Sequence, residues 1–189
     1  MRFLKNIGLF CVASLLLIAC GEEPKPVKKA KPVTPSEPRF TQIETPSFSG
    51  DSAFAFVEKQ VNFGPRVPGS EGQRSCAKFL ENSFKRFGLE TEVQRAEVTA
   101  FNGKQLPIYN IIGRYKPERS ERMLVFAHWD TRPFADRDEK DRAKPIDGAN
   151  DGGSGTGVIL ELARILSLDT AGPDIGVDFI LFDAEDYGK

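Results

Sequence analysis

The sequence predicts an α/β domain built on a mixed, mainly parallel sheet. Its 189 residues are 40% hydrophobic and 28% charged, which is ordinary for one soluble globular domain with an N-terminal attachment. Segment 123–128 is almost continuously apolar, as expected of a central strand covered on both faces. A polar loop, a helix from Ser154 and a second buried strand at 177–183 follow it. Such a strand–helix–strand crossover favours a parallel sheet.

The first 19 residues have the features of a secretory signal peptide. Arg2 and Lys5 precede an apolar stretch, 7–19, that is too short to span a bilayer comfortably. The order Leu-Ile-Ala-Cys at 17–20 resembles the bacterial lipoprotein cleavage box, so we expect cleavage before Cys20 and lipidation of that cysteine. The alternative is an ordinary signal peptide with an unrelated cysteine. The lipoprotein interpretation predicts a lipid-anchored protein of a Gram-negative cell envelope, in the outer membrane or periplasm.

Residues 20–48 are expected to form a tether, followed by a folded domain over 49–189. The tether is rich in proline, lysine, glutamate and threonine, a composition that cannot bury a core. Asp51 is the expected N-cap of a first helix. Ser70 is the expected N-cap of a second helix, whose apolar residues recur at helical spacing as far as Gly88.

Three strands are expected next, followed by a long polar loop. The strands are centred on 92–101, 107–115 and 123–128, and the loop runs from 130 to 151. A loop of this length in a small domain is usually functional or mobile. The helix from Ser154 and the strand at 177–183 complete the series.

Charge and cysteine content exclude some classes of function and structure. The net charge is −1 and there is no dense basic run, so we expect no binding to nucleic acid. Of the three cysteines, Cys11 leaves with the signal peptide and Cys20 carries lipid. Cys76 then remains as a buried thiol, and no intrachain disulfide is available to the mature segment.

Acidic residues and the single histidine lie where predicted strands end. His128 closes segment 123–128, Asp151 lies where the loop enters the helix, and Glu185 and Asp186 follow the last strand. Ligands of open α/β sheets collect beyond the carboxyl ends of strands, so these segments are expected to meet at one edge. Taken alone, the acidic pair would be interpreted as a solvated strand end rather than as part of a metal site. Together, the imidazole and carboxylates are ligands that zinc takes, and one acid can bind metal while the other moves protons.

The glycine-rich run at 152–157 has a second possible interpretation as a phosphate-binding loop. It lacks the Gly-Lys-Ser/Thr ending of such a loop, and it follows a long polar loop rather than a strand. We therefore interpret these glycines as allowing close backbone packing where Asp151 is presented.

Four ordered segments carry a family resemblance from about Asp51 to the end of the chain. They read Phe-Gly-Pro-Arg-Val-Pro-Gly-Ser at 63–70, Ala-His-Trp-Asp-Thr-Arg-Pro at 127–133, Gly-Ala-Asn-Asp-Gly-Gly-Ser-Gly at 148–155 and Phe-Asp-Ala-Glu-Asp-Tyr-Gly at 182–188. The series resembles the zinc-dependent M28 peptidase family, and most closely its glutaminyl-peptide cyclotransferase branch in the bacterial lipoprotein form. The resemblance implies a three-layer α/β/α fold of the zinc-exopeptidase type, incomplete at the C-terminus.

The resemblance also implies a ligand set. One zinc ion would be bound by Asp151, Asp186 and a later histidine, with Glu185 as general acid and base. In two-zinc aminopeptidase relatives the residue matching Asp151 bridges both ions and the one matching His128 is a ligand. His128 is therefore expected to bind metal only if a second ion is present. Trp129 is expected to form a wall of an apolar substrate pocket or, equally, to be a core tryptophan at a strand end.

The reaction implied by the resemblance converts an N-terminal glutamine of a peptide or protein into pyroglutamate with release of ammonia. The alternatives are M28 aminopeptidase action on N-terminal residues, or a non-catalytic, lipid-anchored binding protein that has kept the fold. The family pattern includes a later histidine ligand and a further acidic residue, and this sequence has one histidine. We therefore expect the truncated chain alone to bind zinc poorly, to be inactive and to expose the flank of its last strand.

Overall fold

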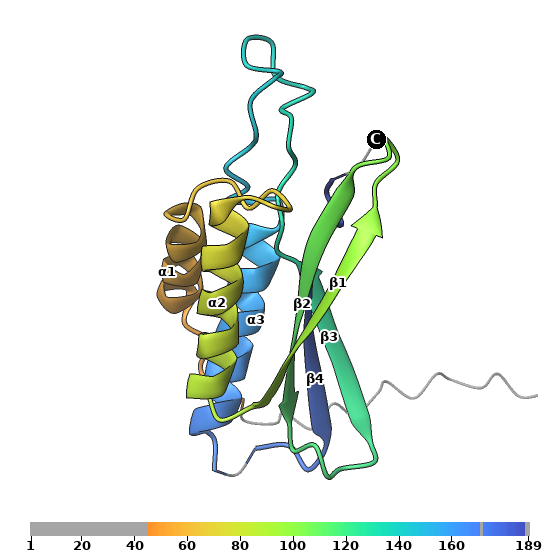
Figure 1. Ribbon diagram of the computed structural model, residues 1–189. Coiled ribbons are helices and arrows are strands. Elements are labelled where there is room, and N and C mark those ends of the chain that lie inside the picture. Colours follow the sequence, from red (N-terminus) through yellow and green to blue (C-terminus); the bar gives the residue numbers. More distant parts are fainter. Residues whose placement is uncertain (1–44, 171, 188–189) are drawn as a thin grey trace, which may run out of the picture. The chain divides into compact units, whose positions relative to one another are not determined.

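The computed structural model describes residues 45–170 and 172–187, all within one folded unit, Glu44–Lys189. The predicted signal peptide, Cys20 and most of the predicted tether lie outside the described residues. No helix in the described ranges is long and apolar enough to cross a membrane. The elements follow in the order α1 (Gly50–Val61), α2 (Glu71–Arg86), β1 (Glu90–Thr99), β2 (Gln105–Tyr115), β3 (Arg122–His128), α3 (Gly153–Leu168) and β4 (Gly176–Phe182) (Figure 1).

The four strands form one mixed sheet in the order β1-β2-β4-β3. β1 pairs antiparallel with β2, β2 pairs antiparallel with β4, and β3 pairs parallel with β4 through the α3 crossover. The α/β class and the mixed sheet are confirmed. The prediction of a mainly parallel sheet is wrong for the described residues, because the short link at 100–104 permits only an antiparallel return from β1 to β2.

All three helices cover the same face of the sheet (Figure 1). The core between them contains Leu80 and Phe84 of α2, Leu160 of α3, and Phe179 and Leu181 of β4. The opposite face of the sheet has no covering layer among the described residues. The described part therefore has two of the three layers that the resemblance implies.

The uncovered face carries apolar side chains near the end of β3. Leu124 is 54% exposed, Phe126 is 61% exposed and Phe182 is 37% exposed, and the last two rings pack edge to face at 5.8 Å. β4 lies between β2 and β3, so the unpaired edge at this side of the described sheet belongs to β3. The expectation that the last strand has an exposed flank is therefore wrong, because the crossover inserts β4 inside the sheet.

The helix ends follow local capping chemistry. The hydroxyl of Ser49, rather than the predicted Asp51, accepts a hydrogen bond from the backbone N–H of Ser52 at 3.1 Å and caps α1. Asp51 lies in the first turn, where its charge interacts favourably with the helix dipole. The prediction for α2 is confirmed, since Ser70 caps its start and Gly88 follows its C-cap with a φ of +74°. Cys76 is fully buried in the core, as predicted.

A buried carboxylate joins α2 to the sheet at the carboxyl end of β4. Oδ2 of Asp183 accepts hydrogen bonds from the side-chain amide of Gln73 at 2.7 Å and from the backbone N–H of Tyr109 at 2.8 Å. Burial raises the pKa of the Asp183 carboxyl to about 7, although these donors favour the charged form. Folding is therefore coupled to protonation of this group.

We predict that Asp183→Asn changes how stability depends on pH. The folded-state pKa lies above the unfolded value of 3.8, so the native state holds the proton more tightly. This contribution is complete below about pH 4 and is lost as the pH rises through about 7. The wild-type chain should lose stability relative to the variant over this window, by at most about 4 kcal/mol. Denaturant unfolding at a series of pH values, followed by circular dichroism, measures the difference.

The matched control for this prediction is Asp138→Asn, on the exposed loop. The backbone amides of Asp141 and Lys140 lower the pKa of the Asp138 carboxyl, so its effect on the pH profile should have the opposite sign. Unfolding free energies of the wild type and Asp183→Asn that stay parallel from pH 4 to pH 7.5 would contradict the coupling.

Candidate metal site

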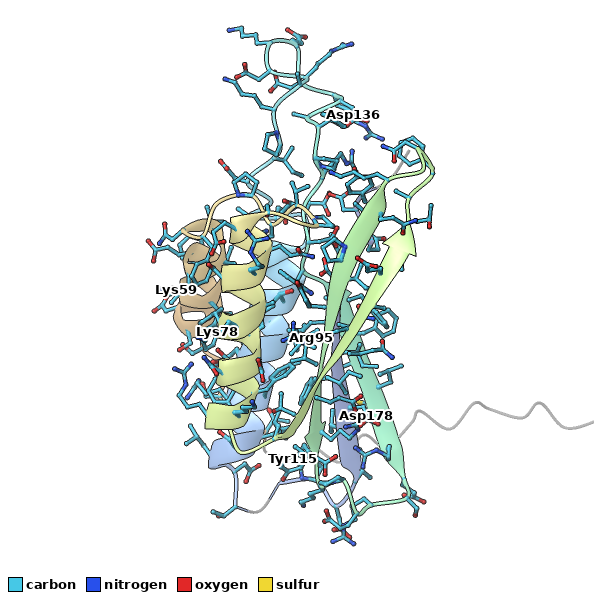
Figure 2. The ribbon with its side chains drawn as sticks, viewed as in Figure 1. Lys59, Lys78, Arg95, Tyr115, Asp136 and Asp178 are labelled. Atoms are coloured by element: carbon cyan, nitrogen blue, oxygen red, sulfur yellow. The ribbon has the colours of Figure 1, made fainter. Side chains whose placement is uncertain are left out.

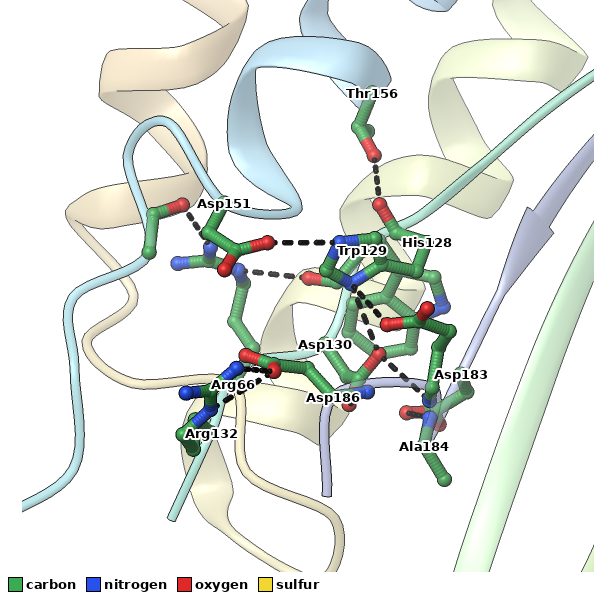
Figure 3. Close-up of polar contacts among 12 residues, drawn as sticks. Arg66, His128, Trp129, Asp130, Arg132, Asp151, Thr156, Asp183, Ala184 and Asp186 are labelled. Carbon is green, nitrogen blue, oxygen red and sulfur yellow. Dashed lines mark hydrogen bonds and ion pairs between the residues drawn. The ribbon is translucent and has the colours of Figure 1, made fainter. Parts of the chain in front are cut away.

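Three chain segments meet beyond the carboxyl ends of β3 and β4 (Figure 3). The parallel register pairs His128 with Phe182, so both strands end at the same level. Nε2 of His128 lies 3.1 Å from Oδ1 of Asp151, two residues before the start of α3. Nδ1 of His128 lies 3.8 Å from Oε2 of Glu185, in the turn after β4. The convergence expected from the predicted topology is therefore present.

The carboxylate of Asp130 connects the segment after β3 to the turn after β4. Its side chain is fully buried. Oδ1 accepts a hydrogen bond from the backbone N–H of Glu185, and Oδ2 accepts one from the backbone N–H of Asp186, both at 3.1 Å. Hydrogen bonds to a charged acceptor are stronger than neutral ones, so these two amides hold the turn in place.

The turn itself has an unusual backbone. Ala184 has a φ of +62°, in the left-handed region that favours glycine. Its N–H donates to Oδ1 of Asp183 at 2.9 Å. The hydrogen bonds from Asp183 and Asp130 therefore fix a conformation that alanine adopts reluctantly. The turn leaves the Glu185 side chain 64% exposed and that of Asp186 only 5% exposed.

The start of α3 lies close to His128 because Gly152 has no side chain. Gly152 has a φ of +80°, and a Cβ at this position would lie 2.6 Å from the carbonyl oxygen of Asp130. One turn into the helix, the hydroxyl of Thr156 donates to the carbonyl of His128 at 3.1 Å. The glycines thus allow close backbone packing beside Asp151, as predicted from the sequence. A cavity of about 460 Å³ opens here, lined by His128 and Asp151 among others.

The charge state of His128 follows from the acids around it. Asp130, 3.4 Å from Nδ1, contributes most, and Glu185 and Asp151 add to its effect. Together they raise the pKa of the imidazole to about 9. The imidazolium then lies between Asp130 and Asp151 and offsets the repulsion between the carboxylates.

A buried arginine holds both ends of the long loop. The guanidinium of Arg66 donates to the carbonyl oxygens of Trp129 at 3.0 Å, Asp147 at 2.8 Å and Gly148 at 2.6 Å. Arg66 is fully buried, and this burial lowers its pKa. This role of Arg66 is not predicted from the sequence, although the residue lies in the turn-rich segment 63–70 that carries the family resemblance.

The two oxygens of Asp186 differ in their contacts within the described part of the chain. The guanidinium of Arg132 donates to Oδ1 of Asp186 at 2.7 and 3.0 Å, and to Oδ1 of Asp136 at 3.0 Å. Oδ2 of Asp186 is buried and has no hydrogen-bond partner among the described residues. An anionic oxygen buried without a partner is costly, so this atom is suited to accept a cation.

The candidate ligand atoms at this site are of types that bind zinc. Oxygens of Asp151 and Asp186 and the imidazole of His128 are ligand types that zinc uses. In the part of the chain that the structure describes, however, no three His, Cys, Asp or Glu side chains lie close enough together to hold a metal ion. The described site therefore offers suitable ligands but an incomplete set.

Trp129 does not line a substrate pocket. Its side chain is fully buried in the hydrophobic core, and its indole N–H donates to the carbonyl of Tyr109 at 3.2 Å. The prediction of a pocket wall is wrong, and the alternative of a core tryptophan at the strand end is correct. The reason is the alternation of side chains along an extended strand: Trp129 follows His128, so it faces the helices.

Comparisons with known proteins identify relatives of the chain. The sequence model described as Peptidase family M28 matches residues 110–189. Tannerella forsythia glutaminyl cyclase is 51% identical with a TM-score of 0.74, over 76% of this chain and 50% of that chain. A Zn-dependent exopeptidase from Parabacteroides distasonis is 49% identical with a TM-score of 0.74, over 76% of this chain and 49% of that one. Aminopeptidase YwaD of Bacillus subtilis is 40% identical over 156 residues, 79% of this chain and 30% of that protein.

The chain thus spans about half the length of these solved relatives and a smaller share of the aminopeptidase. The segment matched by the family contains His128, Asp151, Glu185 and Asp186, together with β3, α3 and β4. Sequence and fold therefore agree over the elements that form the candidate site. The part of the chain that forms the candidate site, residues 110–189, matches peptidase family M28, and the chain is similar in sequence and fold to a glutaminyl cyclase and a Zn-dependent exopeptidase.

Proposed function

We propose that this chain carries carboxylate ligands and the proton-transfer group of a zinc-dependent glutaminyl-peptide cyclotransferase. The reaction forms N-terminal pyroglutamate from glutamine and releases ammonia. The observation that carries the proposal is the acid pair after β4, in which Oδ2 of Asp186 is buried without a partner among the described residues and the carboxylate of Glu185 is exposed. The 51% identity to a glutaminyl cyclase supports the proposed reaction.

In this proposal, Asp151 and Asp186 hold the zinc ion, and Oδ2 of Asp186 is the oxygen free to do so. A zinc ion bound there supplies a Lewis acid that polarises the γ-amide carbonyl of the substrate glutamine. Arg132 keeps Oδ1 of Asp186 in place. The network of Asp130 and His128 orients the other ligand, Asp151, from the opposite side.

Glu185 is the proposed catalytic residue. Its backbone is fixed by Asp130 while its carboxylate is 64% exposed, so it is positioned yet accessible to substrate. The carboxylate would take a proton from the attacking α-amine and deliver it to the leaving nitrogen, which departs as ammonia. The adjacent acids therefore have separate roles, because one is buried against Arg132 and the other is exposed.

We further propose that the substrates are N-termini of peptides or proteins and that lipid on Cys20 anchors the enzyme in the cell envelope. The proline-rich segment after Cys20 would separate the domain from the membrane surface. The proposed proton-transfer group is exposed at the edge of the sheet, so the N-terminus of a peptide or protein substrate could reach it.

Aminopeptidase action is the second candidate, favoured by the 40% identity to Aminopeptidase YwaD. It would require His128 to release Asp151 and bind a second ion. The two reactions give different products, since a cyclase releases ammonia and an aminopeptidase releases free amino acids.

We predict that a chimera will show cyclase activity. Residues 45–187 would be joined to the part of Tannerella forsythia glutaminyl cyclase that this chain does not match. With zinc, the chimera should release ammonia from peptides that begin with glutamine, measured by a coupled assay, while this chain alone should release none. Release of free amino acids from unblocked peptides would favour the aminopeptidase. A folded, zinc-loaded chimera with neither product would contradict both assignments.

We also predict that Glu185→Gln in this chimera separates metal binding from turnover. The variant should keep its zinc content but lose roughly a hundred- to ten-thousandfold in kcat, because the proton-transfer group is removed. Glu118→Gln, an exposed residue whose side chain is 66% accessible, is the matched control and should leave kcat unchanged. Metal analysis and ammonia release are measured on the same samples. Full turnover by Glu185→Gln would exclude the assigned role.

A further inference from the structure

A groove lies between α2 and β1, apart from the candidate metal site. It has a volume of about 500 Å³ and is lined by Ala77, Lys78 and Asn82 on the helix and by Val93, Arg95 and Tyr109 on the sheet. We call it the α2–β1 groove. Figure 2 shows Arg95 in the space between the sheet and α2, the helix that carries Lys78. Its volume lies within the range of small-molecule sites, about 300 to 1,000 Å³.

The groove has an excess of positive charge. Two further charged residues at its rim are neutralised within α2: Arg74 pairs with Glu71 at 2.8 Å, and Glu81 pairs with Lys85 at 2.5 Å. Lys78 and Arg95 have no ion-pair partner among residues 45–170 and 172–187. The one acidic residue at the groove, Glu81, is thus already paired, and the charges of Lys78 and Arg95 are left unbalanced. The groove therefore favours anions over cations.

The floor of the groove is a fixed aromatic surface. Arg95 lies over the Tyr109 ring, with its guanidinium carbon 4.9 Å from the ring centre. The Tyr109 backbone is held on both sides, because its N–H donates to Asp183 at 2.8 Å and its carbonyl accepts from the Trp129 indole at 3.2 Å. The ring itself packs against the hydrophobic core and under Arg95, so it is ordered before any ligand arrives, which lowers the cost of ordering a ligand beside it.

We propose that the α2–β1 groove binds a small organic anion that joins one carboxylate or phosphate to a planar apolar part. The anionic group would lie between Lys78 and Arg95, since a guanidinium can pair with two oxygens of either group at once. The apolar part would lie on Ala77 and Val93, beside the Tyr109 ring whose face Arg95 covers. None of the residues assigned to zinc or proton transfer lines this groove, so the inference is independent of the proposed function.

Binding of two anionic probes to this chain tests the proposal. Phenyl phosphate and benzoate are titrated at low salt by calorimetry, with inorganic phosphate and neutral benzyl alcohol as comparison ligands. At least one aromatic anion should bind at 1:1 stoichiometry, at least fivefold more tightly than inorganic phosphate or benzyl alcohol. The two anionic arms distinguish phosphate from carboxylate recognition. Equal binding of inorganic phosphate would overturn the role of the apolar floor.

Charge-removing variants locate the bound anion. The double variant Lys78→Gln/Arg95→Gln removes both charges but keeps polar side chains, and it should weaken binding at least tenfold. Lys140→Gln/Lys144→Gln removes the same charge from the exposed long loop and should change the affinity less than twofold. Circular dichroism confirms that each variant is folded. Unchanged affinity in the groove variant, or no saturable binding by the wild type, would refute the site.

Discussion

The buried carboxylate of Asp130 is the interaction on which the candidate site depends. It accepts the backbone N–H groups of Glu185 and Asp186, 55 and 56 residues further along the chain. Burying this charge is costly, and the two amides together with the nearby His128 imidazole offset that cost. The positions of the proposed proton-transfer group and of a proposed zinc ligand therefore follow from one carboxylate that itself lies outside the cavity.

Further buried contacts extend this constraint to the third segment of the site. Arg66 binds carbonyls at both ends of the long loop, and Gly152 allows α3 to approach the backbone of Asp130. Asp151 is thereby brought to His128 on the side opposite Glu185. Replacing the arginine would leave buried carbonyl groups unpaired, and a side chain in place of the glycine would clash with the neighbouring backbone. Such a site is expected to be rigid, which suits positioning of metal ligands.

Part of this arrangement can be predicted from the sequence. Apolar runs followed by acids mark strand ends, and crossover topology then brings His128, Asp151, Glu185 and Asp186 together. The residues that hold them are harder to predict from the sequence. Asp130 and Arg66 bind backbone atoms whose positions depend on the path of a long loop. The burial of Trp129 could have been predicted, since neighbouring residues of a strand face opposite sides. The antiparallel pairing of β2 with β4 could not be predicted. It depends on the position at which the β1–β2 hairpin packs against β4.

The central claim is that Asp130 holds the turn after β4. Amide hydrogen exchange at Glu185 and Asp186, followed by NMR in this chain and in Asp130→Asn, tests it most directly. Asparagine keeps one acceptor oxygen and loses the other, so at least one of the two amides should exchange faster while Phe179 and Leu181 in β4 stay protected. Both amides exchanging at unprotected rates in the wild type, or an unchanged pattern in the variant, would contradict this account.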